Sequence, residues 1–171
     1  MEIKGKPSRM AGLFLYAAIL QGAIAALITF LGGFGDQIGL FPVSVSRVIA
    51  GGEAGMWFIM GYLAYIIVGV VAMAVTSLFY FYIETVLGKV YSGVSKALAW
   101  MHLVLGNVGV AGAAILAMVG GYLGSAGQQL QSTQLESILQ YYSQPIAAFL
   151  ILALLGFILG GLGYLVAMRS K

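Results

Sequence analysis

The stretch AGMWFIMGYLAYIIVGVVAM, residues 54–73, contains no charged residue and no proline. A helix that crosses the hydrocarbon core of a bilayer needs about 20 mostly apolar residues, so this stretch alone is long enough. The apolar run extends to about residue 83, and three similar runs cover about 10–34, 97–123 and 145–168. The sequence therefore predicts an all-α integral membrane protein, a four-transmembrane-helix bundle that forms one domain over residues 1–171.

The composition is typical of an integral membrane protein. Hydrophobic residues make up 61% of the chain and charged residues only 8%, whereas soluble domains carry about 25% charged residues. The chain has no cysteine, which excludes disulfides, thiolate metal sites and iron–sulfur clusters. The basic residues flank the apolar runs and form no patch with interleaved aromatics, so we expect no nucleic-acid partner.

The basic residues predict the orientation of the bundle. Seven of the eight fall on one predicted side, namely Lys4, Lys6, Arg9, Lys89, Lys96, Arg169 and Lys171. Arg47 alone falls on the other side. The positive-inside rule then places both termini in the cytoplasm, and we expect the cell membrane of a prokaryote.

Aromatic residues near the ends of the runs mark the predicted membrane surfaces, because Trp and Tyr favour the headgroup level. On the outer side these are Trp57, Tyr122, Tyr141 and Tyr142, and on the inner side Tyr80, Tyr82, Trp100 and Tyr164. The second outer loop contains QQLQSTQLESILQYY, residues 128–142. Its apolar residues share one helical face, which predicts a short amphipathic helix on the outer surface or against a partner.

Small residues recur at four-residue spacing in three of the runs. This spacing places them on one stripe of a helix, where they let neighbouring backbones approach closely. The sequence leaves two uses of the stripes open, namely packing within the bundle itself and packing against a partner subunit. The predicted packing residues are Gly22, Gly109, Ala113, Ala117, Gly121, Gly156 and Gly160.

Three polar residues fall inside the predicted spans. Gln21 and Asn107 lie near mid-membrane, and we predict that they form a hydrogen-bonded pair that ties two helices together. His102 is the only histidine and lies five residues into the third run. Its simplest interpretation is a neutral structural side chain bonded to a backbone carbonyl or to water. Haem ligation, with a second ligand from a partner, and a proton relay are the alternatives.

The segment 79–112 adds a resemblance to a known family. An aromatic cluster and a loop, YFYIETVLGKVY, are followed by ALAWMHLVLGNVGV, a Gly-rich exit at 120–127 and a last apolar run. This order resembles the last three transmembrane helices of haem-copper oxidase subunit I. In that family the helix matching 54–83 carries the His-x-His haem ligands, which are missing here. The resemblance also implies that His102 occupies the place of a histidine that does not bind haem.

The leading functional expectation is a non-catalytic membrane subunit of a respiratory redox complex, similar to a haem-copper terminal oxidase. No catalytic constellation is present, so we do not expect an enzyme. This chain alone would bind no cofactor, and haem and copper would be in partner subunits. Expected partners are other integral membrane subunits and the bilayer, with quinol nearby. The alternatives are a small homo-oligomeric channel or transporter with Gln21 and Asn107 facing a pore, and a haem b subunit that uses His102.

Overall fold

The computed structural model describes residues 9–133 and 137–169, and every regular element within these ranges is helical. In chain order the elements are α1 (Arg9–Phe34), α2 (Val45–Ala50), α3 (Glu53–Ala64), the π-helical segment η1 (Tyr65–Val71), α4 (Ala72–Phe81), the π-helical turn η2 (Tyr82–Val86), α5 (Gly93–Gln129) and α7 (Leu139–Arg169).

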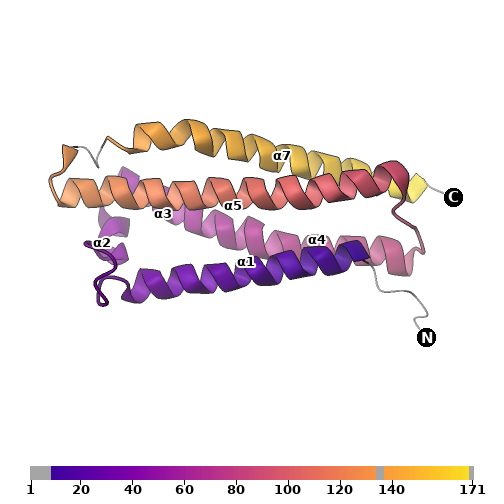
Figure 1. Ribbon diagram of the computed structural model, residues 1–171, viewed down its shortest axis with the longest axis horizontal. Coiled ribbons are helices and arrows are strands. Elements are labelled where there is room, and N and C mark those ends of the chain that lie inside the picture. The colour runs from indigo at the N-terminus through magenta and orange to yellow at the C-terminus, as the bar shows by residue number, and fades with distance from the viewer. Residues whose placement is uncertain (1–8, 134–136, 170–171) are drawn as a thin grey trace.

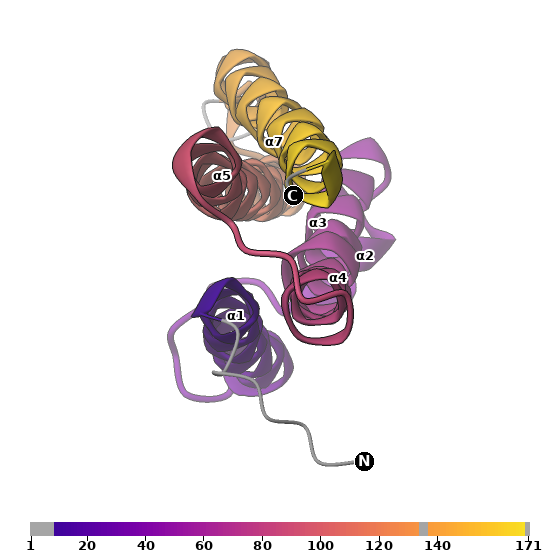
Figure 2. The ribbon, with the colours of Figure 1, turned by 90° about the vertical axis from the view of Figure 1, so that its right-hand side faces the viewer.

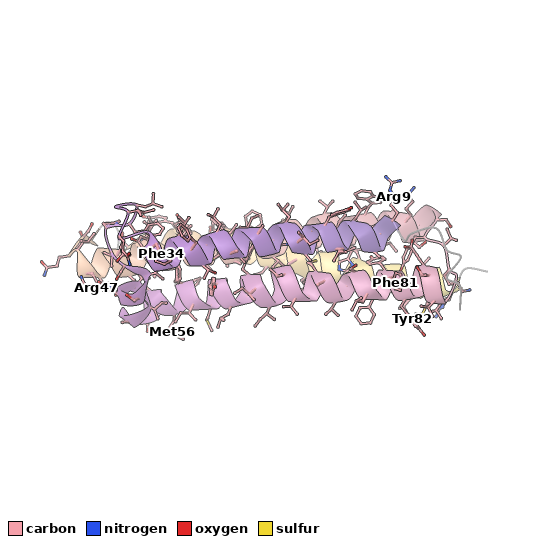
Figure 3. All side chains as sticks on the ribbon, turned by 90° about the horizontal axis from the view of Figure 1, so that it is seen from below. Arg9, Phe34, Arg47, Met56, Phe81 and Tyr82 are labelled. Carbon is pink, nitrogen blue, oxygen red and sulfur yellow. The ribbon has the colours of Figure 1, made fainter. Side chains whose placement is uncertain are left out.

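Four helical segments are long and apolar enough to cross a membrane: Arg9–Phe34, Glu53–Val86, Gly93–Gln129 and Leu139–Arg169. They confirm the predicted number and order of spans, and they define a multi-pass membrane protein. α1 begins and α7 ends at the same end of the bundle, which we call the termini end, and α2 lies at the opposite end, the α2 end (Figure 1). Arg9 and Tyr82 mark the termini end in Figure 3, whereas Phe34, Arg47 and Met56 mark the α2 end.

The helices extend beyond the predicted apolar runs. α5 begins at Gly93 because Ser92 and Ser95 form a capping box, in which Ser95 Oγ accepts the Ser92 backbone N–H at 3.1 Å. α7 begins at Leu139 and carries Pro145 in its interior, whereas the sequence analysis started this helix at the proline. Hydropathy identifies only the apolar part of a helix. The polar capping residues and polar first turns of α5 and α7 lie outside the apolar runs, so the helices are longer than predicted.

The segment 128–142, for which an amphipathic helix is predicted, overlaps the ends of two spanning helices. Its first two residues belong to the end of α5, and residues 139–142 form the first turn of α7. A backbone turn follows α5, where Ser132 N–H donates to the Gly127 carbonyl at 2.8 Å. Residues 134–136 of the segment lie outside the described part of the chain. The apolar residues at the far end of the segment therefore extend a spanning helix.

The second span, Glu53–Val86, crosses the bundle from α5 to α1. α3 packs mainly against α5, whereas α4 packs mainly against α1 (Figures 1 and 2). The π-helical segment η1 lies between these two contacts, and such segments locally widen a helix and change its direction. The span is 34 residues long, or about 51 Å at 1.5 Å per residue, which exceeds the roughly 30 Å of a hydrocarbon core. An oblique path accommodates this length.

α5 and α7 pack through glycines with almost no space between their backbones. A methyl group added at Gly156 would lie 2.9 Å from Cα of Gly106, and one added at Gly109 would lie 2.7 Å from Cα of Ala153. Real Cβ atoms essentially never come within 3.0 Å of such atoms. The contact therefore requires glycine on both helices.

α3 meets the other end of α5 in the same way. A Cβ at Gly61 would lie 2.7 Å from the Ala114 carbonyl oxygen, and a Cβ at Gly121 would lie 2.7 Å from the Ala54 carbonyl oxygen. Gly22 of α1 lies against the second span, with Val70 at 3.6 Å from an added Cβ. The small-residue stripes lie against neighbours within this chain, including Ala113 and Ala117 beside Ile146 and Gly160 beside His102.

Two adjacent glycines of α7 test this packing. A Cβ at Gly160 would overlap the His102 ring, whereas nothing lies within 4 Å of a Cβ at Gly161. We expect Gly160→Ala to lower the free energy of unfolding by about 1–3 kcal/mol, the usual cost of overpacking. The control Gly161→Ala should leave it unchanged or raise it slightly, because alanine favours helix. Equilibrium unfolding in SDS, followed by circular dichroism, measures both, and equal effects would contradict the packing.

Candidate functional site

An amide pair links two spans near the middle of the bundle. Gln21 Nε2 of α1 donates a hydrogen bond to Asn107 Oδ1 of α5, as the sequence analysis predicts. Asn107 Nδ2 in turn donates to the Leu103 carbonyl at 2.7 Å. Gln21 is only 5% exposed, and a Cβ at Gly69 of η1 would overlap its Oε1. The pair therefore lies where α1, η1 and α5 meet.

The geometry of the pair favours a bonding role over a conducting one. Amides carry no charge and do not titrate, so they cannot store or pass on a proton as a carboxylate or imidazole does. The Gln21 amide nitrogen donates to the Asn107 side-chain oxygen, and the Asn107 amide nitrogen donates to a backbone carbonyl. Interhelical hydrogen bonds of this kind help to hold spans together in lipid, where no hydrophobic effect drives helices to associate.

Two further hydrogen bonds tie α1 to the second span, and the sequence analysis missed both. Ser77 Oγ of α4 donates to the Ala11 carbonyl at 2.7 Å. Thr29 and Tyr62 share a hydrogen bond of 2.7 Å between their hydroxyl oxygens. Isolated Ser, Thr and Tyr residues are common in spans, so their positions in the sequence carry little signal before the helix faces are known.

His102 lies in an aromatic cluster near the termini end. Tyr80 Oη and His102 Nδ1 share a hydrogen bond of 3.2 Å, so the partner of the histidine is a tyrosine and not the carbonyl or water that we expected. Ring centroids of Phe14 and Phe157 lie 4.9 and 5.8 Å from the imidazole, and Tyr164 lies at 6.3 Å. The residue is 3% exposed. His102 is therefore enclosed by aromatic rings and has one hydrogen-bond partner among the described residues.

The enclosure of His102 does not fit haem ligation. Its Nε2 is buried and has no hydrogen-bond partner among the described residues, so this nitrogen is the one a metal would need. The rings around the imidazole, and the Gly160 backbone against it, leave no room for a planar macrocycle. An iron could reach Nε2 only if the surrounding aromatic core repacked. We therefore derive no haem chemistry from this residue.

The same cluster buries one of the predicted inner aromatics. Tyr80 is fully buried inside the bundle, with Phe14 stacked on it at 4.8 Å and Tyr164 at 4.9 Å between ring centroids. Tyr91 of the loop before α5 packs on it at 5.1 Å. Burial raises the pKa of the Tyr91 hydroxyl above its ordinary value, with smaller contributions from Tyr164 and Glu84, so Tyr91 remains neutral at physiological pH.

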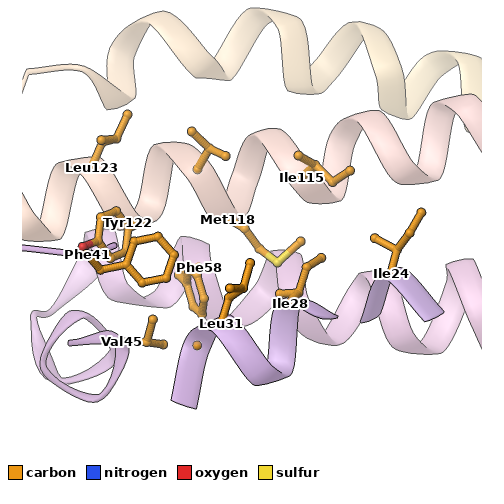
Figure 4. Close-up of a pocket in the computed structure, with 12 residues that line it drawn as sticks. Ile24, Ile28, Leu31, Phe41, Val45, Phe58, Ile115, Met118, Tyr122 and Leu123 are labelled. Carbon is orange, nitrogen blue, oxygen red and sulfur yellow. The ribbon is translucent and has the colours of Figure 1, made fainter. Parts of the chain in front are cut away.

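An apolar cleft of about 490 Å³ separates α1 from α5 toward the α2 end (Figure 4). Ile24 and Ile28 form its α1 wall, and Ile115 and Met118 form its α5 wall. Among its twelve lining residues the only polar side-chain atom is the Tyr122 hydroxyl, which donates to the Val43 carbonyl at 2.9 Å. The sequence does not reveal this cleft, because its walls come from segments far apart in the chain.

The described residues do not gather the ligands of a metal centre. Within residues 9–133 and 137–169, no three His, Cys, Asp or Glu side chains lie close enough to hold an ion. The three polar residues singled out from the sequence separate into two places, with Gln21 and Asn107 bonded to each other and His102 in the aromatic cluster.

No protein-family model matches the chain, and no curated protein and no solved structure matches it either.

The amide pair can be tested by a double-mutant cycle. We expect Gln21→Leu and Asn107→Leu each to lower the free energy of unfolding by about 1–2 kcal/mol, because each leaves the other amide unpaired in the bundle. The double variant should lose less than the sum of the two. Gln128→Leu, at an exposed position near the end of α5, is the control. Unfolding in SDS measures all four, and strictly additive losses would show that the two amides do not interact.

A haem titration tests the enclosure of His102. Haem added to the purified chain in detergent should give no Soret band that depends on His102, because the imidazole is packed among rings. The wild type and His102→Ala are compared at equal protein concentration. A shifted Soret band that appears with the wild type and disappears in His102→Ala would contradict this expectation.

Proposed function

We propose that this chain is a non-catalytic membrane subunit of a respiratory redox complex, similar to a haem-copper terminal oxidase, and that its bundle packs against a catalytic subunit. The haem and copper of such a complex would be in partner subunits, with quinol reacting there. The oxidase class rests on the resemblance of segment 79–112. The non-catalytic role rests on the polar side chains of the bundle, because Gln21, Asn107 and His102 are engaged in hydrogen bonds between helices.

One observation carries the proposal, namely how the resembling segment is used in the fold. Tyr80, Tyr91 and His102 come from three separate parts of that segment and meet in one buried core. The core joins the end of the second span to the start of α5, and Phe14 of α1 closes it from the other side. A helix–loop–helix unit of oxidase-like order would in this way be kept as a scaffold while its histidine serves packing.

The charge distribution supports the orientation that we propose. The described basic residues Arg9, Lys89, Lys96 and Arg169 belong to the termini end, and Arg47 belongs to the α2 end. By the positive-inside rule the termini end would face the cytoplasm of a prokaryotic cell. The α2 end, with α2 and the turn after α5, would face outward.

The amide pair gives less support to the alternative of a channel or transporter. A pore needs polar groups that face water, and ion pathways usually carry a charged residue within the span. Gln21 and Asn107 are directed at each other and at the Leu103 carbonyl. The haem b alternative is weakened by the enclosure of His102 described above.

Affinity purification from native membranes tests the proposal. The tagged chain is extracted in mild detergent, and the proteins that accompany it are quantified by mass spectrometry against an unrelated multi-pass protein with the same tag. We expect a haem-bearing large subunit and a copper-domain subunit at matched stoichiometry. Haem absorbance of the eluate should follow the amount of tagged chain.

Recovery of the chain alone or only as a homo-oligomer would contradict the proposal. Ion flux through vesicles that contain the pure chain would then be measured with Gln21→Leu and Asn107→Leu variants. Flux that both variants abolish would assign the mid-membrane pair to a pore and replace the accessory-subunit function.

A further inference from the structure

We propose that the cleft between α1 and α5 is a binding site for one hydrocarbon chain of a membrane lipid. The bound chain fills the space between these two helices in the α2 half of the bundle and stays there as a permanent part of the folded protein. This inference is independent of the redox function proposed above. It rests on the walls of the cleft, on its chemistry and on the surface into which it opens.

The cleft is bounded at both ends by bonded contacts. Toward the middle of the bundle, the Gln21–Asn107 hydrogen bond joins α1 to α5 about one turn beyond Ile24. Toward the α2 end, Phe41 and Tyr122 close it with ring centroids 5.1 Å apart, and Tyr122 is held by the Val43 carbonyl. The walls are thus fixed at both ends while the space between them is retained. Its volume, about 490 Å³, falls in the usual range of preformed ligand sites.

The segment that closes the cleft at the α2 end, made of the loop with Phe41 and helix α2, is itself bonded to α5. Ser125 Oγ donates to the Val48 carbonyl at 2.9 Å, and Gln129 Nε2 donates to the Arg47 carbonyl at 2.9 Å. These bonds fix α2 on the end of α5, and the loop that carries Phe41 lies between α1 and α2. Closure of the cleft by inward movement of α1 would therefore disturb bonds at both of its ends.

The lining favours a flexible chain over a partner helix. Close helix packing in lipid needs small residues at the contact, and the small residues of α5 already face α7 and α3. The cleft walls instead carry large branched or flexible side chains such as Ile28, Ile115 and Met118, with Gly32 as the exception. A lipid headgroup or a quinol ring would find no free polar side chain to bond there. The apolar chain of a lipid matches this lining.

The cleft is continuous with the lipid-facing surface of the spans. Ile115 and Val119 line it and remain 39% and 40% exposed, and Leu27 on the neighbouring face of α1 is 56% exposed. A lipid lying beside the bundle could therefore insert a chain sideways, between α1 and α5, without crossing a polar barrier. Dispersion contacts with walls on both sides would hold that chain more tightly than the flat surface outside.

Two adjacent glycines at the end of α1 provide a matched test. Gly32 lines the cleft, where a Cβ would meet Val45 only at an ordinary 3.9 Å, so a leucine there folds and fills the space. Gly33 has nothing within 4 Å of its Cβ position and is exposed. Wild type, Gly32→Leu and Gly33→Leu are incubated with palmitoyl-oleoyl phosphatidylglycerol, exchanged into lipid-free detergent and weighed by native mass spectrometry. We expect one retained lipid per chain in wild type and Gly33→Leu.

Retention in Gly32→Leu should fall about tenfold, which corresponds to about 1.4 kcal/mol of binding free energy. Val119→Phe blocks the same cleft from α5, and its control is Val108→Phe at an exposed position of the same helix. Equal retention in the cleft variants and their controls would overturn the proposal. Absence of retained lipid in the wild type would overturn it as well. A protein partner that is captured by photo-cross-linking residues substituted for Ile115 and Val119 would also overturn it, because the cleft would then be a protein interface.

Discussion

The fold depends on the close approach of backbones along one helix, α5. In lipid, apolar side chains gain little by packing on other helices, so association relies on van der Waals contact between closely spaced backbones and on hydrogen bonds. α5 supplies such contacts twice, with Gly109 and Gly106 against α7 and Gly121 against α3. A single methyl group at Gly109 or Gly121 would overlap backbone atoms of the neighbouring helix, and one at Gly156 of α7 would overlap the backbone of Gly106. These glycines therefore fix how closely both neighbouring helices approach α5.

α1 is attached by a different kind of interaction. Its contacts to the rest of the bundle include hydrogen bonds from Gln21 to Asn107 and from Ser77 to the Ala11 carbonyl. Around Phe14 and Tyr80, a packed aromatic core fills the termini half of the bundle. In the α2 half the same helix stands away from α5 and leaves the apolar cleft. The two halves therefore differ in what occupies the space between α1 and α5.

The polar residues singled out from the sequence make hydrogen bonds between helices of the bundle. His102 bonds to Tyr80 and is enclosed by rings, and the mid-membrane amides bond to each other. In the function that we propose, this chain positions helices and presents an apolar surface to a catalytic subunit. This is the physical basis for proposing an assembly role, whereas the oxidase class rests on the order of residues in segment 79–112.

The sequence by itself determined the four spans, because hydropathy over about 20 residues is a local property of the chain. It also indicated the small-residue stripes and the Gln21–Asn107 pair, since amides in lipid need partners and few candidates exist in these spans. Only the tertiary structure decided that the stripes lie against helices of the same chain, that Tyr80 is the partner of His102, and that the second span crosses from α5 to α1 through a π-helical segment. The cleft was likewise beyond the sequence. Each of these features depends on which helix faces meet across the bundle, and residue spacing along one helix does not specify the neighbour that its face will contact.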